Sequence, residues 1–143
     1  VFFLLTLLTG LFLSWVYPWC LTLYLENGVI QFIGVVLLLI SLILNTLAYR
    51  EFKNALTPHA PFMKPKVLIQ NGIFTVSRNP VYLALVLSEY GLAFVFDSLW
   101  LLVTAFILLI ALHYLIVLEE EKVLKGIFKE RYERYKRHTR RWF

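Results

Sequence analysis

The residues best suited to bind a charged ligand lie in two short clusters, of which the first is Arg78-Asn79-Pro80. It stands just before an apolar segment that begins near Tyr82, and proline favours the first position of a helix. The free N–H groups and positive dipole end of a helix N-terminus suit a carboxylate or phosphate, to which Arg78 could add a bidentate contact. Ser77 or Asn79 is expected to cap this helix. Taken alone, Arg78 is better explained as an anchor to lipid headgroups.

The second cluster is the run Glu119–Glu121, preceded by His113. His113, Val117, Glu120 and Leu124 step by four, three and four residues, which predicts that they share one helix face. An isolated glutamate run is more often a solvated helix exit. A histidine at membrane depth usually faces a partner or a cavity, so His113 favours a site.

Glu89 lies inside the apolar run Tyr82–Phe96. A carboxylate at membrane depth is costly and tends to line a cavity or find a partner, for which His113 and Tyr90 are candidates. Equally, Glu89 could be protonated and join helices. Both interpretations remain open from the sequence.

The elements that position these residues are apolar helices, because 60% of the 143 residues are hydrophobic. A helix needs roughly 20 apolar residues to cross a membrane. We predict an all-α integral membrane protein with about four transmembrane helices, at Val1–Leu25, Val29–Tyr49, Tyr82–Phe96 and Leu99–Leu118. Pro18 is expected either to kink the first of these helices or to end it near the outer surface. A further helix before Val1 is left open.

The prediction is a single membrane domain, with two helices in residues 1–51 and the remaining elements in 52–143. Asp97-Ser98 is so short a connection that the last two membrane helices form an antiparallel hairpin. Leu118–Tyr135 contains no proline, which predicts that the last helix continues as an amphipathic cytoplasmic helix. That helix either lies on the bilayer or folds back over the preceding loop.

All fourteen Lys and Arg residues fall in two stretches, Arg50–Arg78 and Lys122–Arg141. The positive-inside rule therefore places the loop 52–80, the C-terminus and the N-terminus in the cytoplasm, in a cell inner membrane or the endoplasmic reticulum. The net charge of +5 fits contact with anionic membrane lipids. Nucleic acid is a poor partner, because the basic residues lie against a membrane.

Several familiar chemistries have no counterpart in the sequence. There is no Ser/His/Asp arrangement, Walker loop or CxxC pair, and Cys20 is the single cysteine. His59 and His138 are scattered and do not predict a metal site.

Taken together, the ordered motifs resemble the integral-membrane methyltransferases, the superfamily of isoprenylcysteine carboxyl methyltransferase and phospholipid N-methyltransferase. The resemblance covers about Thr57–Trp142 and is carried by an ordered series: Pro58, Pro65, Leu68, Asn71-Gly72-Ile73-Phe74, Arg78-Asn79-Pro80-x-Tyr82, His113-Tyr114, Glu120-Glu121, Leu124, Phe128, Tyr132, Tyr135 and Arg141-Trp142.

The resemblance implies an S-adenosylmethionine pocket between the last two membrane helices and the cytoplasmic C-terminal helix. The cofactor-binding residues that it implies are Gly72, Arg78, Asn79, Pro80, Tyr82, His113, Glu120 and Glu121. It implies methyl transfer to a carboxylate, amine or thiol of a lipophilic small molecule or lipid, with Arg78 in a catalytic role. Glu89 is the candidate for shaping the acceptor site.

Two positions depart from the family pattern, in which glycines are frequent: Ala84 and Lys129. The methyl group of Ala84 leaves less room for a neighbouring helix to pack closely. Lys129 in place of glycine removes an expected break in the C-terminal helix. Two alternatives stay open, namely an NADPH-dependent membrane reductase of the sterol-reductase type and a non-enzymatic protein that keeps the fold. Binding of S-adenosylhomocysteine versus NADPH distinguishes them. The acceptor and the oligomeric state are not predicted.

Overall fold

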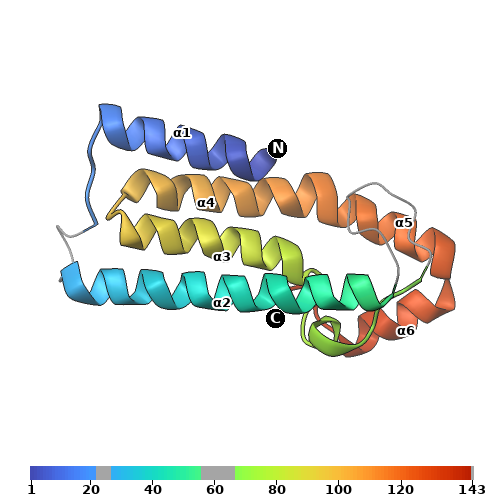
Figure 1. Ribbon diagram of the computed structural model, residues 1–143. Helices are drawn as coiled ribbons and strands as arrows, with labels where there is room; N and C mark the ends of the chain where they lie inside the picture. The colour runs from blue at the N-terminus through green and yellow to red at the C-terminus, as the bar shows by residue number, and fades with distance from the viewer. Residues whose placement is uncertain (22–26, 56–66, 143) are drawn as a thin grey trace.

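The computed structural model describes residues 1–21, 27–55 and 67–142, and the regular elements of this part of the chain are helices (Figure 1). The stretch that holds Pro58, His59 and Pro65 lies outside the described residues. In chain order the elements are α1 (Phe2–Val16), α2 (Asn27–Asn54), the 3₁₀ turn η1 (Gly72–Thr75), α3 (Pro80–Val95), α4 (Leu99–Ala111), the π-helical segment η2 (Leu112–Val117), α5 (Leu118–Phe128) and α6 (Glu130–His138).

Two helices are long and apolar enough to cross a membrane. Gly28–Asn54 has 27 residues, and α4, η2 and α5 form a continuous helix over Leu99–Phe128 of 30 residues. They coincide with the spans predicted around residues 29–49 and 99–118. The other two predicted spans correspond to α1 and α3, which are apolar but shorter. Four crossings therefore remain a prediction.

α1 ends at Val16, well before Leu25, so of the two effects expected of Pro18, a kink or an end to the helix, the structure has the end. Tyr17 is the last residue whose N–H bonds back into the helix, to the carbonyl of Leu13 at 2.8 Å. The ring of Pro18 disfavours α-helical backbone at the residue before it, and Tyr17 accordingly has φ −129° and ψ 80°.

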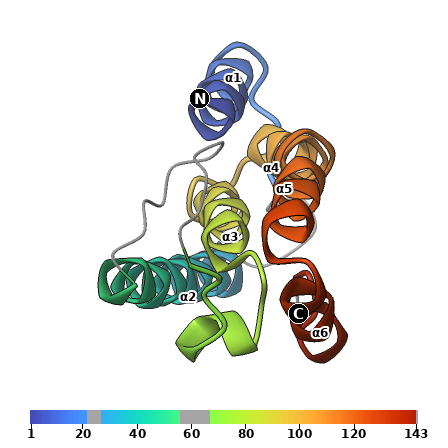
Figure 2. The ribbon, with the colours of Figure 1, turned by 90° about the vertical axis from the view of Figure 1, so that its right-hand side faces the viewer.

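The helices pack side by side, with α3 between α2 and α4 and with α1 against α4 (Figures 1 and 2). The predicted hairpin of α3 and α4 is confirmed. Its turn contains Asp97 at φ 50°, and the Ser98 hydroxyl caps α4 by accepting the Leu101 N–H at 3.2 Å.

The helices α2 and α3 approach each other closely along a line of small residues. A Cβ atom on Gly34 would lie 2.8 Å from the carbonyl oxygen of Gly91 and 2.8 Å from the backbone nitrogen of Val95. Further along, the Ser41 hydroxyl donates to the carbonyl of Ala84 at 2.8 Å. Ala84 is buried here, so alanine fits this contact in place of the family's glycine.

The predicted continuous helix from Leu118 to Tyr135 is also wrong. α5 ends at Phe128, and Lys129 turns the chain with φ 46° and ψ −120°, so the break persists without a glycine. α6 then folds back beside α5 (Figure 1). Tyr132 and Tyr135 pack against Leu68 of the preceding loop. Of the two predicted placements, the structure has the helix folded over the loop.

Candidate functional site

The site is built where the start of α3 meets the 139–142 segment (Thr139–Trp142). Ser77 and Arg140 form an isolated parallel bridge, in which the Arg78 N–H donates to the carbonyl of Arg140 at 3.0 Å. Asn79 holds the N-cap position of α3, yet its side chain caps nothing and instead donates from Nδ2 to the carbonyl of Arg141 at 3.1 Å. Pro80 occupies the first turn of α3, as predicted.

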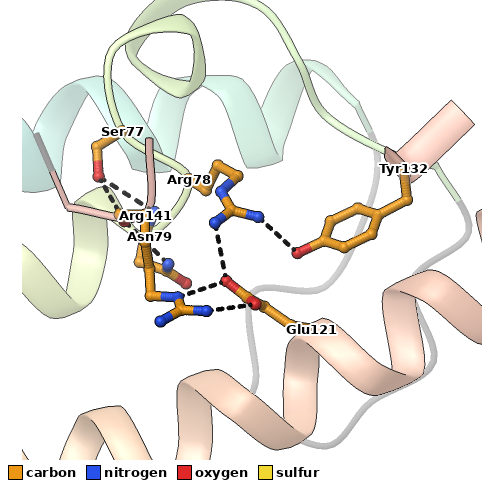
Figure 3. Close-up of polar contacts among 6 residues, drawn as sticks. All are labelled: Ser77, Arg78, Asn79, Glu121, Tyr132 and Arg141. Carbon is orange, nitrogen blue, oxygen red and sulfur yellow. Dashed lines mark hydrogen bonds and ion pairs between the residues drawn. The ribbon is translucent and has the colours of Figure 1, made fainter. Parts of the chain in front are cut away.

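Three charged side chains converge at this junction (Figure 3). Arg141 donates to Glu121 through both Nε (2.8 Å, to Oε1) and Nη2 (3.0 Å, to Oε2). Arg78 Nη2 lies 3.1 Å from the same Oε1. The side chains are largely buried, with exposed fractions of 7% for Arg78, 11% for Glu121 and 29% for Arg141. Glu121 is therefore held between two guanidinium groups.

One buried nitrogen of Arg78 has no partner in the described part of the chain. Its Nη1 donates to the Tyr132 hydroxyl at 3.2 Å, whereas its buried Nε has no hydrogen-bond partner among the described residues. Burial, and then the charge of Glu121, raise the pKa of Tyr132 to about 12, so this phenol stays protonated at neutral pH. Buried donors are seldom left unpaired, so the Nε marks a place for an acceptor.

The three consecutive glutamates point to three different partners. Glu120 accepts a hydrogen bond from the Tyr82 hydroxyl of α3 at 2.6 Å. Glu119 is exposed and pairs with Lys122 at 2.6 Å. The structure thus joins Glu120 and Glu121 to the start of α3 and leaves Glu119 outside this junction.

His113 lies in the π-helical segment η2, a feature that the sequence did not predict. Its ring is half-buried and lies 6.2 Å, centroid to centroid, from the indole of Trp142, with an angle of 30° between the planes. The ring of Tyr114 contacts it edge-on at 4.9 Å. His113 therefore lies beside the 139–142 segment.

Two predicted site residues lie elsewhere. Glu89 is fully buried and accepts a hydrogen bond from Thr6 of α1 at 2.8 Å, rather than from His113 or Tyr90. It stands nine residues after Pro80, about 13 Å along the helix. This contact favours the interpretation that Glu89 joins helices. Gly72 has φ 58° and lies against Glu51 of α2, so it shapes the loop without reaching Arg78.

Sequence reasoning missed the roles of Arg141 and of the Tyr132 hydroxyl. Arg141 is one of nine basic residues from Lys122 onward, and its residue type does not distinguish it from the others, which the positive-inside rule explains. Tyr132 entered only as a member of the ordered motif series, which gives its hydroxyl no separate role; its ring packs with Leu68 and Tyr135. The signal available for Arg141 was its place in the motif Arg141-Trp142.

The chain matches the phospholipid methyltransferase family over residues 29–131 and belongs to that family. The family match and the two long apolar helices together identify a membrane methyltransferase. The matched region contains Arg78, Tyr82, Glu120 and Glu121, whereas Tyr132 and Arg141 lie beyond it. No curated protein and no solved structure gives a significant match.

Proposed function

We propose that the protein transfers a methyl group from S-adenosylmethionine to a lipophilic acceptor at the cytoplasmic face of the membrane. The observation that carries this proposal is the unpaired Nε of Arg78, a buried cationic donor at a helix N-terminus with two glutamates nearby. A carboxylate ligand satisfies such a donor by a charge-assisted hydrogen bond.

The residues present fit the groups of this cofactor. Arg78 and the N-terminus of α3 would hold its carboxylate. Glu120 uses Oε1 for Tyr82, and its Oε2 accepts nothing from the described residues, which leaves it for an ammonium or ribose hydroxyls. The half-buried rings of His113 and Trp142 offer flat surfaces for an adenine. When bound, the cofactor supplies an electrophilic methyl group.

The protein's own contribution is binding, orientation and exclusion of water. The acceptor is a carboxylate, amine or thiol on a lipid-soluble molecule, and the family's description favours a phospholipid. A carboxylate or thiolate acceptor is already deprotonated, so methyl transfer to it needs no strong base. This agrees with a site in which Arg78, Glu121 and Arg141 are paired with one another. An isoprenylcysteine-type carboxylate belongs to the same acceptor class.

The cytoplasmic orientation rests on charge. α6 and the start of α3, which Arg78 precedes in the chain, lie away from the turn between α3 and α4 (Figure 1). The basic residues of the described chain are thus gathered at the end that carries the site, which the positive-inside rule assigns to the cytoplasm.

The test is equilibrium binding of S-adenosylhomocysteine and of NADPH to the detergent-purified protein. We expect S-adenosylhomocysteine to bind, and Arg78→Ala and Glu120→Gln to weaken binding about ten- to a hundredfold, since a charged hydrogen bond contributes roughly 1.5–3 kcal/mol. Gln at 120 still accepts from Tyr82, so folding is preserved. Glu119→Gln is the matched control and should bind as the parent does.

Each other outcome has a definite meaning. Binding of NADPH in place of S-adenosylhomocysteine would indicate a reductase, and binding of neither would indicate a protein that keeps only the fold. If S-adenosylhomocysteine binds but Arg78→Ala and Glu120→Gln match the Glu119→Gln control, the site is wrongly placed.

A further inference from the structure

Glu121 is poorly placed to bind a cationic ligand, because its charge is already shared by two arginines. Arg141 occupies both carboxylate oxygens and Arg78 shares Oε1. An ammonium group arriving there would meet two guanidinium groups in a largely buried setting, where repulsion between like charges is strong. This observation separates Glu121 from Glu120, whose described partner is a neutral hydroxyl.

We infer that Arg141 is a positioning residue: by holding Glu121 from one side, it keeps the Nε of Arg78 free for the ligand. This inference rests on the proposed function. An arginine and a carboxylate prefer a bidentate pair that uses two N–H groups of the fork. Here Arg78 gives Glu121 only Nη2, because Arg141 supplies the bidentate contact.

Without the Arg141 side chain, Glu121 is free to rotate and pair with Arg78 through both Nε and Nη2. The unpaired donor would then be consumed inside the protein, and the ligand's carboxylate would have to compete with Glu121 for it. Arg141 therefore prevents an internal ion pair that would close the anion site. The family match ends before Arg141, so it assigns this residue nothing.

The backbone of the 139–142 segment is held independently of the Arg141 side chain. The carbonyl of Arg140 accepts from the Arg78 N–H at 3.0 Å, and the carbonyl of Arg141 accepts from Asn79 Nδ2 at 3.1 Å and from Ser77 Oγ at 3.3 Å. Removing the Arg141 side chain, as in Arg141→Ala, therefore leaves the backbone of the 139–142 segment bound to residues 77–79. The neighbouring Arg140 has an exposed side chain that makes no ion pair or hydrogen bond within the described chain, so it provides a matched control.

The experiment compares two ligands, S-adenosylhomocysteine and 5′-methylthioadenosine, of which the second lacks the amino-acid carboxylate and ammonium. We expect Arg141→Ala to weaken S-adenosylhomocysteine binding on the order of tenfold, the loss of one charged hydrogen bond. Binding of 5′-methylthioadenosine should not change. Arg141→Lys should restore part of the affinity, and Arg140→Ala should leave both ligands unaffected.

A second measurement tests whether Arg141 acts through Arg78. In an Arg78→Ala background, Arg141→Ala should cause no additional loss of S-adenosylhomocysteine affinity, because the donor that it protects is absent. The inference is overturned if Arg141→Ala weakens both ligands equally, as a folding defect would, or if the two losses add. If the parent protein binds no S-adenosylhomocysteine, both the proposed function and this inference are wrong. A parent that binds and an Arg141→Ala variant that binds equally well refute the inference alone.

Discussion

Lys129 is one of two residues other than glycine with a positive φ in the described chain, and it offers a direct test of the fold. Its φ of 46° with ψ −120° lies where a Cβ atom is strained and glycine is not. The side chain is exposed and makes no hydrogen bond or ion pair within the described residues. Lys129→Gly should therefore remove strain without removing a contact.

The expected gain follows from two opposing terms. A residue held in a sparsely populated region costs about 1–3 kcal/mol. A new glycine makes the unfolded chain more flexible, which costs about 0.4–1 kcal/mol. The net stabilisation is about 1 kcal/mol, which raises the melting temperature by about 2–4 °C for a chain near 150 residues.

The assay is thermal unfolding of the detergent-purified variants at one scan rate. Lys129→Ala is the matched control, because it removes the same charge and side chain but keeps the Cβ atom. It should melt with the parent. If Lys129→Ala gains as much stability as Lys129→Gly, charge and not backbone strain explains the effect. If Lys129→Gly lowers the melting temperature, the chain does not turn at this residue as described.

Two further predictions concern packing and topology. Gly34→Ala should destabilise the fold by about 1–3 kcal/mol, because the added Cβ atom would lie 2.8 Å from backbone atoms of α3. Gly28→Ala is the control and should melt as the parent does in the same thermal assay, because a Cβ atom on Gly28 would have no neighbour within 4 Å. In a Cys20→Ser background, Lys136→Cys should react with an impermeant thiol reagent from the cytoplasmic side and Phe96→Cys from the other. Labelling of both from one side would contradict the arrangement of α3 and α4 across the membrane.

The parts of the fold that the sequence predicts are those decided by apolar length and by short connections. The stretch Leu99–Leu118 and the two-residue link Asp97-Ser98 leave little choice but a helix in a hairpin, and the structure has one. The ends of helices depend on single residues. Pro18 ends α1, which is one of the two outcomes that proline predicts there. Lysine at 129 gives no such signal, because positive φ is uncommon for it.

The composition of the site was predictable, but its internal pairing was not. The motifs bring Arg78, Glu120 and Glu121 together, as the resemblance implies. Which glutamate meets which partner depends on the π-helical segment η2, which contains His113 and ends three residues before Glu120. One additional residue in a turn rotates everything after it by about 100° relative to an unbroken α-helix, so a face assigned by steps of three and four cannot be carried through it.

The division of work between the glutamates then follows from the position of the 139–142 segment. Glu121 faces two guanidinium groups, those of Arg141 and Arg78, whereas Glu120 faces the hydroxyl of Tyr82 through Oε1 and has Oε2 left for a ligand. Under the proposed function, two adjacent residues of the same type would therefore have different tasks, one within the protein and one toward the cofactor. A substitution at Glu121 should therefore change ligand affinity through Arg78. A substitution at Glu120 should change ligand affinity directly. For this reason the affinities of the two variants must be measured with different ligands.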